Sequence, residues 1–339
     1  MKYILSPDTF EVKEIFNPQL ISKGLNVYYL VEKKGLSHKQ LLKRLPKDAC
    51  FCGIKDRNAT TKQWMSSQQV ISDINEKDLK LKLVGYSDKK IYIGLHKGNA
   101  FTVKVEFGRE ESTEIKNFKA KKEYVCNYFG EQRFSENTQE ICKALEEKNY
   151  ENALKLFLTK KSKFDSDKSR AMKKIIEENW SNWKIILEDK EIKGTGKVVL
   201  FEYLEKNPAD FENAFLHTEE KSTKTLIKAA QALRFNKELN KLAEKKKPNN
   251  IKAQIAGQDL NMGASKAFPR KITINPTEFE KKFRKSDLER RTFFTVDKFR
   301  AKLIKGNEFE ISFELGRGIY ATVFLKYLEA WLKNKINKG

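Results

Sequence analysis

Alternating apolar and polar residues indicate short strands at both ends of the chain. In the segment 9–16, Phe10 and Val12 face one side while Glu11 and Lys13 face the other, which is the two-residue period of a half-buried strand. Similar patterns predict strands over 27–31, 50–54, 61–67, 91–93, 101–107 and 308–315. Strands therefore dominate the first hundred residues and return near the C-terminus.

The middle of the chain has the spacing of helices instead. Apolar residues recur three and four positions apart over 138–158 and 168–187, and in a helix opened by Ser222. Further helices are predicted after Ser37, with Leu41, Leu42 and Leu45 on the inner face, over 114–124, and from Tyr320 to about Lys335. The helix after Ser222 is expected to end at the basic run 241–247 and Pro248. These elements predict an α+β fold in which a helix-rich segment interrupts the strands.

The chain is strongly basic. It carries 68 Lys plus Arg against 46 Asp plus Glu, a formal net charge of +22 over 339 residues. That length favours about two domains, and a polyanion, most commonly nucleic acid, is the natural partner for such a charge. Because lysine supplies most of the charge, a genome-wide bias toward lysine is also consistent with it. The charge therefore favours RNA binding without identifying it.

The cysteines and histidines do not indicate a metal site. No Cys-x-x-Cys pair is present, and Cys50 and Cys52 fit core thiols better than zinc ligands. His38, His96 and His217 lie in polar segments and are expected at the surface. No apolar run approaches the roughly 20 residues of a membrane span, and the N-terminus lacks the apolar core of a signal peptide. We therefore expect a cytoplasmic protein without a metal ion.

Lys55, Asp56 and Arg57 lie in the connection between two predicted strands, over 50–54 and 61–67. A rigid scaffold exposes the side chains of such a connection. A carboxylate between two cations keeps its charged form because the cations lower its pKa. Taken alone, such a tripeptide is most often a solvated turn with exposed ion pairs. These residues therefore allow Asp56 to act as an ionised nucleophile or base without requiring it.

Three blocks of sequence resemble the signatures of one enzyme family. They are Gly53-x-Lys55-Asp56-x-x-Ala59-x-Thr61-x-Gln63-Trp64, Asn127-Tyr128-Phe129-Gly130-Glu131-Gln132-Arg133-Phe134 and Gly318-Ile319-Tyr320-Ala321-Thr322-Val323. In this order they resemble motifs of the TruD family of tRNA pseudouridine synthases. Weaker likenesses, such as the one over 233–239, extend the resemblance across most of the chain.

The resemblance implies a fold and a domain organisation. The family has a pseudouridine synthase catalytic domain with a mixed, largely antiparallel sheet, interrupted by a helix-rich α/β insertion called the TRUD domain. On this chain the first part of the catalytic domain would cover 1–150, the insertion 151–285 and the C-terminal part 286–339. The enlarged helical middle is similar to that of archaeal and eukaryotic members rather than to the compact bacterial form.

The resemblance also implies the residues that do the chemistry. Asp56 lies at the position of the family's catalytic aspartate, and Phe10 matches the aromatic of an N-terminal motif near the bound nucleotide. Without the resemblance, Phe10 in an alternating strand would be a core residue. Lys55 and Arg57 would keep Asp56 ionised or contact phosphates of the RNA backbone.

Three further residues are implied to hold the substrate. The amide of Asn127 offers a donor and an acceptor to the edge of a uracil. Arg133 would pair with a phosphate or brace the Asp56 connection. Tyr320 follows Gly318, which lets the backbone approach a ligand closely, and its ring could stack on a base.

The implied reaction is the isomerisation of uridine to pseudouridine in tRNA, at uridine-13 of the D arm. The product is an isomer, so no cofactor is expected. Asp56 would either add to C1′ of the ribose or remove the C2′ proton, and the sequence does not choose between these routes. The alternatives are a synthase that acts on other RNA sites and a non-catalytic RNA-binding protein. A nuclease is disfavoured because no paired carboxylates are visible. No protein partner or membrane is implied.

Overall fold

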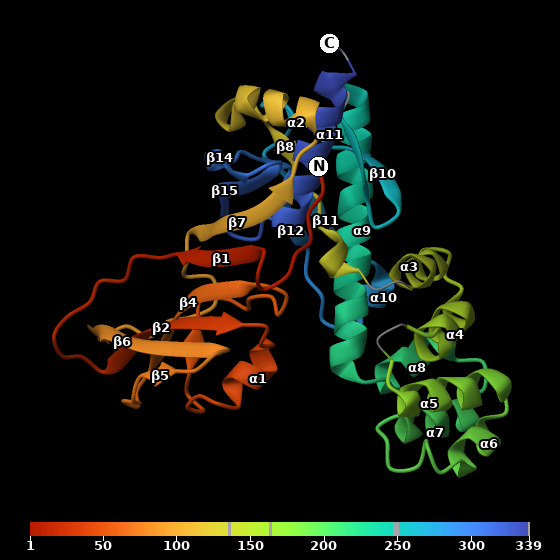
Figure 1. Ribbon diagram of the computed structural model, residues 1–339. Coiled ribbons are helices and arrows are strands. Elements are labelled where there is room, and N and C mark those ends of the chain that lie inside the picture. The colour runs from red at the N-terminus through yellow and green to blue at the C-terminus, as the bar shows by residue number, and fades with distance from the viewer. Residues whose placement is uncertain (135–136, 163–164, 247–250, 338–339) are drawn as a thin grey trace.

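The computed structural model describes residues 1–134, 137–162, 165–246 and 251–337, and consists of a large sheet beside a lobe of helices (Figure 1). The sheet contains β1 (Phe10–Ile15), β2 (Asn26–Lys34), β3 (Cys50–Phe51), β4 (Thr60–Ser67), β5 (Ile74–Asn75), β6 (Leu79–Ser87), β7 (Gly98–Glu106), β14 (Asp297–Lys305) and β15 (Glu308–Gly316). Their order is β14-β15-β7-β1-β4-β2-β6-β5, with β3 paired to β4.

The sheet joins the two ends of the chain, because β7 lies between the N-terminal strand β1 and the C-terminal strand β15. β1 pairs with β4 in parallel, the one parallel pair in the described part of the sheet, and with β7 in antiparallel fashion, so that Val12 lies opposite Phe101. β15 pairs with β7 along its whole length, with Ile311 opposite Val103. The α+β fold with a mixed, largely antiparallel sheet, expected from the sequence, is therefore confirmed.

Three short strand pairs accompany the sheet in the described ranges, together with a segment of two consecutive 3₁₀ turns. The pairs are β8 (Val125–Cys126) with β13 (Phe293–Phe294), β9 (Lys252–Ile255) with β10 (Gln258–Asn261), and β11 (Lys271–Ile274) with β12 (Leu288–Arg291). The turns are η1 (Ile115–Asn117) and η2 (Ala120–Lys122), which follow α2 (Arg109–Glu114).

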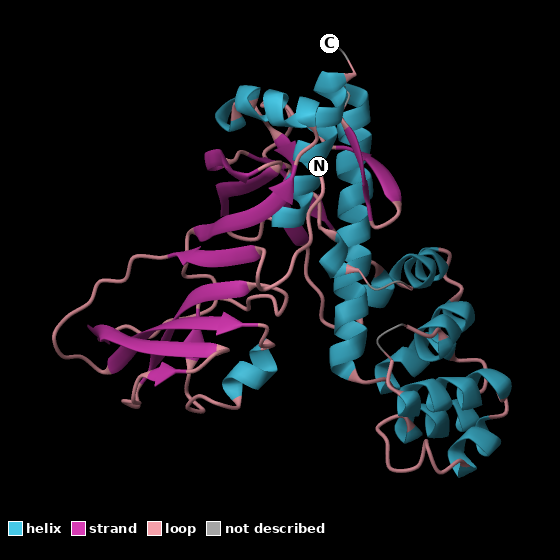
Figure 2. Ribbon diagram, viewed as in Figure 1, coloured by secondary structure: helices cyan, strands magenta, loops and turns pink. Residues whose placement is uncertain are grey.

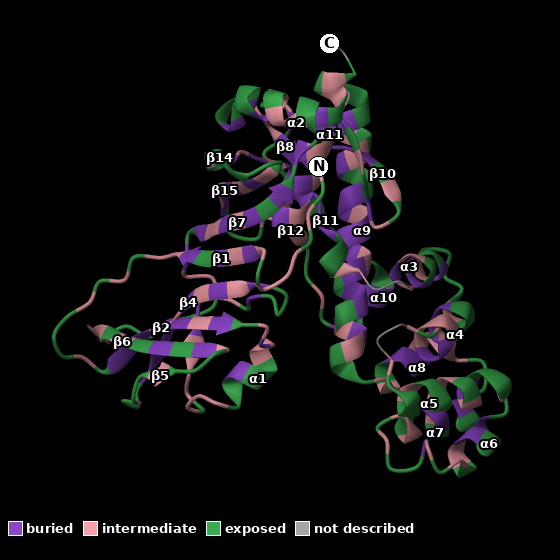
Figure 3. Cartoon of the chain, viewed as in Figure 1, coloured by how far each residue is buried: buried purple, intermediate pink, exposed green. Residues whose placement is uncertain are grey.

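The last helix, α11 (Ala321–Ile336), covers one face of the sheet. Its apolar positions Val323, Phe324, Leu328 and Trp331 are all buried, as their helical spacing predicts. Phe324 packs on Phe313 of β15 with ring centres 4.6 Å apart. Buried residues alternate along β7 and line the inner side of the helices above it (Figure 3). This packing fixes the start of α11 relative to the strands.

The same face of the sheet carries a second, smaller core at β2 and β4, under α1 (His38–Leu42). Ser37 caps this helix in a capping box with Gln40, and Leu41 is fully buried. Leu42, which the spacing placed on the inner face, is 41 % exposed because the helix is only about one turn long. A single turn can bury only one side of its surface.

The helical lobe has a core of its own. It contains α3 (Thr138–Glu146), α4 (Tyr150–Thr159), α5 (Asp167–Glu178), α6 (Trp183–Glu188), α7 (Val198–Lys206), α8 (Phe211–Ala214), η4 (Phe215–His217) and α10 (Glu278–Lys281). Figure 2 shows these helices grouped together and separated from the strands.

The long helix α9 (Glu220–Lys246) joins the lobe to the sheet (Figure 1). Leu226 and Ile227 in its first half belong to the core of the lobe, whereas Phe235 and Leu239 in its second half belong to the core of the sheet. The domain boundaries at residues 150 and 285 stay a prediction. Ala232, Phe235, Leu239 and Ala243 of α9 share a core with the strands, whereas Leu233 still belongs to the core of the lobe.

Two predicted strands differ from the structure. β3 ends at Phe51, and Ile54 is 71 % exposed. Residues 91–93 form no strand: Ile91 is buried, but Tyr92 and Ile93 are exposed. The backbone N–H of Ile91 donates to Ser66 Oγ instead of to a strand, and Gly94 turns the chain with a φ of +94°.

Two predicted helices are broken. Over 114–124 the chain leaves α2 and makes two 3₁₀ turns, because Phe118 turns inward to pack on Trp331. Over 168–187 the helix stops after Glu178, where Ser181 has a φ of +73°, and α6 begins afresh. The predicted stop over 247–250 lies outside the described residues. Among the described helices, none combines the length and apolar character that a membrane crossing requires.

Candidate active site

A pocket of about 290 Å³ lies where the three sequence blocks meet. The connection between β3 and β4 contributes Gly53 to Asp56, the turn before α11 contributes Arg317 to Tyr320, and Gln132 comes from the block around Asn127. Phe10, Val12 and Phe101 of β1 and β7 line the pocket from the sheet. Segments far apart in sequence therefore converge on one small cavity.

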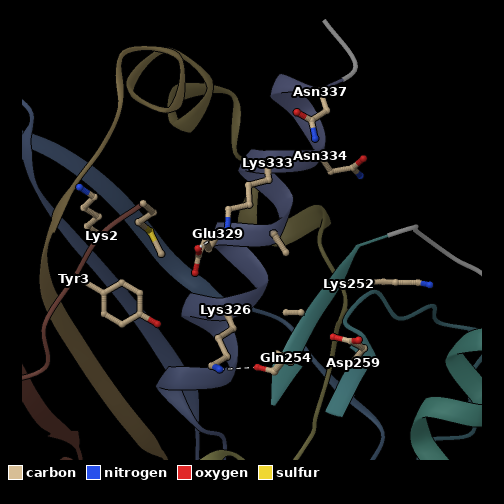
Figure 4. A pocket seen from close by; sticks show the side chains of 13 residues that line it. Lys2, Tyr3, Lys252, Gln254, Asp259, Lys326, Glu329, Lys333, Asn334 and Asn337 are labelled. Atoms are coloured by element: carbon tan, nitrogen blue, oxygen red, sulfur yellow. Dashed lines mark hydrogen bonds and ion pairs between the residues drawn. The ribbon is translucent and has the colours of Figure 1, made fainter. Parts of the chain in front are cut away.

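A larger hollow of about 900 Å³ lies elsewhere, between the N-terminal residues, α11 and the β9–β10 hairpin (Figure 4). Its central lysine, Lys326, is already engaged, because Nζ donates to Glu131 at 2.6 Å and to the Gln254 carbonyl at 2.5 Å. Burial raises the pKa of Tyr3 at its edge to about 12, so that this phenol stays protonated. The smaller pocket is the candidate site, because Asp56 lines it.

Asp56 is exposed and lines the pocket, and a buried lysine binds its backbone carbonyl. The fully buried Lys33 of β2 donates from Nζ to the Asp56 carbonyl at 2.8 Å and to the Leu36 carbonyl at 2.7 Å. Burial lowers the pKa of Lys33 to about 8. A lysine that the sequence reasoning missed therefore fixes the backbone of the proposed catalytic residue.

Lys55 points away from Asp56 and into the sheet. Its Nζ donates to Glu14 Oε1 at 2.6 Å, and both side chains are buried. Glu14 Oε2 also accepts the backbone N–H of Trp64 at 2.8 Å. The expected pairing of Lys55 with Asp56 is thus replaced by a buried pair with Glu14, because the side chains of alternate β1 residues face the pocket side.

Arg57 is also turned away from Asp56. It is exposed, and its Nε donates to the Gly35 carbonyl at 3.2 Å. Within the described ranges, no cation lies within ion-pair distance of the Asp56 carboxylate. The carboxylate is therefore free to meet a ligand that enters the pocket.

The pocket has two aromatic walls, one from the sheet and one from the start of α11. Phe10 is buried and stacks on Phe101 with ring centres 6.0 Å apart, so it is both a core residue and part of the wall. Tyr320 is the N-cap of α11 and follows Gly318, which has a φ of +76°. The Tyr320 ring lies 6.1 Å from that of Phe129. Such walls can hold a planar base between them.

Asn127 does not line the pocket, and its amide is engaged by β12. Oδ1 accepts from Arg290 Nη2 at 2.7 Å, and Nδ2 donates to the Arg291 carbonyl at 3.0 Å. Arg290 also donates from Nε to the Asn127 carbonyl at 2.9 Å. In this arrangement Asn127 fixes Arg290 rather than presenting a free edge.

Arg290 links Asn127 to the aromatic wall. Its guanidinium lies 4.2 Å from the centre of the Phe129 ring and 5.5 Å from that of Tyr320. Burial lowers its pKa to about 10, which leaves it cationic at neutral pH. Arg133, of the turn η3 (Glu131–Arg133), is partly buried and lies 5.8 Å from the same Phe129 ring, outside the pocket. Two arginines therefore flank Phe129.

His96 corrects the expectation that the histidines lie at the surface. It is 8 % exposed, lines the pocket, and its pKa is lowered by burial and by the nearby Lys55. A Cβ on Gly53 would lie 3.3 Å from His96 Cε1, so glycine permits this close packing. The histidine stands in a polar sequence, and nothing in the periodicity of the segment indicates that it is buried.

Glu14, Cys52 and His96 place three possible metal-ligand atoms within 4.8 Å of one another. The ammonium group of Lys55 already neutralises Glu14, and burial raises the pKa of the Cys52 thiol to about 12. A metal ion would have to displace Lys55 and deprotonate the thiol. The cluster is therefore better described as the buried support of the Asp56 connection.

Comparisons with known proteins indicate the family of this chain. The family model described as tRNA pseudouridine synthase D (TruD) matches residues 5–260. The "Probable tRNA pseudouridine synthase D 2" of Methanocaldococcus jannaschii is 27 % identical over 400 residues, which cover 100 % of this chain and 94 % of that protein. The tRNA pseudouridine synthase D of Aquifex aeolicus is 26 % identical over 391 residues, covering 95 % and 96 % of the two chains.

A solved structure shares the fold. The crystal structure of a Methanosarcina mazei protein assigned to TruD matches with a TM-score of 0.66 and 21 % identity, covering 97 % of this chain and 96 % of that one. The family model spans the Asp56 and Asn127 blocks and most of the helical lobe. The chain therefore belongs to the tRNA pseudouridine synthase D (TruD) family.

Proposed function

We propose that the protein isomerises uridine to pseudouridine in tRNA, with uridine-13 of the D arm as its target and Asp56 as its catalytic carboxylate. The observation that carries the proposal is the convergence of the three TruD-like blocks on one pocket with Asp56 at its edge. At about 290 Å³, the pocket is near the lower end of the usual range for ligand sites, about 300 to 1,000 Å³. It suits one nucleoside rather than a stretch of RNA.

The chemistry needs only a base-sized space and a carboxylate. The bond from ribose C1′ to uracil N1 breaks, the base rotates, and C1′ joins C5, so that no atom is gained or lost beyond the exchange of one proton with solvent. Asp56 would start this sequence either by adding to C1′ or by removing the C2′ proton. Because no cation pairs with its carboxylate in the described ranges, Asp56 can approach the ribose directly.

The walls of the pocket would hold the rotating base. Phe10 and Tyr320 offer aromatic faces from the sheet and from the start of α11. A base that has left its stack must be received by such surfaces, because unstacking costs a few kcal/mol. Arg133 and Arg57 lie outside this space, so a contact of either with RNA would be to a backbone phosphate.

The test is pseudouridine mapping on an unmodified tRNA transcript by carbodiimide treatment and primer extension. Wild type should give a stop at position 13 and Asp56→Asn should give none, while the affinity of this variant for the tRNA stays within a few-fold of wild type. Asp167→Asn is the matched control, because this exposed aspartate begins α5 in the helical lobe. Residual turnover in Asp56→Asn would remove Asp56 from the catalytic role.

The same experiment on other RNA decides between the alternatives. A stop at positions other than 13 would give the enzyme a broader or different RNA target. If wild type binds tRNA in a salt-dependent manner but modifies no RNA, the protein would act through its basic surface alone. In that case Asp56→Asn should behave as wild type in every assay of binding.

A further inference from the structure

The loop between β6 and β7 presents two large apolar side chains to solvent beside the pocket. Tyr92 is 63 % exposed and Ile93 is 80 % exposed, and Ile54 on the adjacent connection is 71 % exposed. The two segments are hydrogen-bonded to each other, and apolar side chains exposed close together are characteristic of an interaction site. Neither Tyr92 nor Ile93 takes part in the chemistry proposed above.

The backbone of this loop is fixed at several points. The Gly94 N–H donates to the Cys52 carbonyl at 2.7 Å, and the guanidinium of Arg317 donates to the Gly94 carbonyl. Before the tip, Ile91 is buried and its N–H donates to Ser66 Oγ at 2.9 Å. The tip is therefore held out on a secured backbone, which lowers the entropy lost when it meets a partner.

The anchors also place the tip near the pocket. Cys52 directly precedes Gly53, and Arg317 lines the pocket together with Ile54 and Asp56. The bond between Gly94 and Cys52 therefore puts Ile93 next to the segment that carries Asp56. The tip is therefore close enough to the pocket to meet an RNA strand whose nucleotide occupies it.

The charges around the tip fit RNA better than an apolar protein surface. Lys89, Lys90 and Lys97 of the loop and Arg317 beside it are all exposed. Asp88, at the start of the loop, is its one carboxylate within residues 88–97. An apolar tip surrounded by cations matches a nucleic acid, which presents stacked bases between phosphates.

We propose that Tyr92 and Ile93 form a wedge that enters the RNA stack beside the target uridine and occupies the space that its base leaves. The inference rests on the proposed function, since it assumes that a uridine is drawn into the Asp56 pocket. Inserted apolar side chains are a general way to compensate the cost of unstacking a base. The flanking lysines would contact the phosphates on either side of the unstacked step.

The wedge is tested by making the target easy or difficult to unstack. Single-turnover pseudouridine formation is measured for wild type and for the Tyr92→Ala/Ile93→Ser variant, on a folded tRNA transcript and on a short unstructured RNA with the same target sequence. The variant should be slower by about ten-fold on the folded tRNA and nearly unchanged on the unstructured RNA, because only the folded target needs help to unstack.

A matched control uses the same substitution elsewhere on the catalytic sheet. Ile304→Ser alters an isoleucine that is 47 % exposed near the tip of the β14–β15 hairpin, at the end of β15 remote from the pocket. It should leave both rates at the wild-type value. Equal rates of wild type and the double variant on folded tRNA, or equal losses on both RNAs, would overturn the wedge.

A second readout does not depend on turnover. With 2-aminopurine next to the target uridine, binding of the Asp56→Asn protein should raise the fluorescence, because the fluorescent base loses its stacking partner. Adding Tyr92→Ala/Ile93→Ser to this protein should remove the rise at saturating protein. A rise that persists in the triple variant would contradict the wedge. Absence of turnover by wild type, together with a rise that needs the tip, would instead contradict only the proposed reaction.

Discussion

The two sides of the pocket are held by cations that are used in opposite ways. The strand side of the pocket is formed by β1, β7 and the β3–β4 connection, and the helix side by the start of α11 and the Asn127 block. On the strand side, Lys55 is neutralised by Glu14 inside the sheet. On the helix side, Arg290 donates to the carbonyls of Asn127 and Tyr128 and stacks on Phe129, and within the described ranges it pairs with no carboxylate. Lys55 therefore serves to fix the conformation of the β3–β4 connection, whereas the positive charge of Arg290 is not neutralised.

This difference separates support from substrate contact. A neutralised buried pair contributes little field at a distance, because its two charges nearly cancel. An arginine without a carboxylate partner favours negative charge nearby, as on a phosphate or on a uracil that has lost its bond to ribose. The strand side would position Asp56, and the helix side would stabilise the anion that the reaction forms.

The largest expected effect is that of removing the partner of Lys55. Glu14→Gln leaves a buried ammonium without a counter-charge, and breaking such a pair costs about 3 to 5 kcal/mol. Chemical denaturation with urea should show this loss in the free energy of unfolding. Glu11→Gln on the same strand is the control, because its pair with Lys62 is partly exposed and worth about 1 kcal/mol or less. If Glu14→Gln loses no more stability than Glu11→Gln, the buried pair of Glu14 contributes no more to stability than the pair of Glu11.

The second effect is a pH dependence on the strand side. Burial lowers the pKa of Lys33 from 10.5 to about 8, so between these values the unfolded chain binds a proton that the folded chain has lost. The free energy of unfolding should therefore rise with pH across this window, by about 3 kcal/mol at most, relative to Lys33→Gln. Below about pH 8 the folded state carries the full cost of the buried charge.

Denaturation at several pH values between 7 and about 10.5 measures this difference. Lys34→Gln controls for the loss of one positive charge, because Lys34 is the exposed neighbour of Lys33. A constant difference between wild type and Lys33→Gln over the whole window would mean that Lys33 keeps its proton in the folded state.

The third prediction concerns the helix side. Arg290→Met removes three hydrogen bonds to Asn127 and Tyr128 but also removes a costly partly buried charge. The net loss of stability should be about 2 kcal/mol, less than for Glu14→Gln. The rate of pseudouridine formation is measured at saturating tRNA and well below the melting temperature, where the variant is folded. It should still fall below the wild-type rate, so that the loss of stability does not account for it. Arg291→Met, the exposed neighbour, should change neither. A rate equal to wild type would deny Arg290 any part in stabilising an anion.

The alternation of buried and exposed residues along β1 shows how much of this site could be predicted from the sequence. The alternation that put Phe10 and Val12 on the buried face puts Glu14 on the same face, so a buried carboxylate was predictable from the same pattern. Its partner was not, because Lys55 lies in an irregular connection whose side-chain directions follow no period. The Asp56 block itself could be found by its resemblance to TruD.

The helix side could be predicted in its elements but not in its contacts. The spacing of Phe324, Leu328 and Trp331 gave α11 and its buried face, and Tyr320 begins that helix as expected. The contacts of Arg290 come from β12, more than 150 residues after Asn127 in the chain, and depend on tertiary packing that no local pattern records. Lys33 was hidden for the same reason, since its partners are carbonyls and not side chains.

The smallest expected effect is that of Gly130→Ala. This change tests whether the position of Tyr320 at the start of α11 matters for substrate binding. A Cβ on Gly130 would lie 3.0 Å from Thr322 Oγ1 and 3.1 Å from Tyr320 Cδ1, so Gly130→Ala must push the start of α11 outward by a few tenths of an ångström. We expect a stability loss of about 1 kcal/mol. Because Tyr320 is the residue displaced, the apparent KM for tRNA should rise several-fold.

Gly196→Ala is the matched control, because its Cβ would meet no atom within 4 Å. Such a change should leave stability equal or slightly higher, since alanine restricts the unfolded chain. If Gly130→Ala lowers stability but leaves the KM unchanged, Tyr320 belongs to the packing of α11 and not to the substrate. The base would then be held by Phe10 alone, and the strand side would provide both the carboxylate and the wall of the pocket.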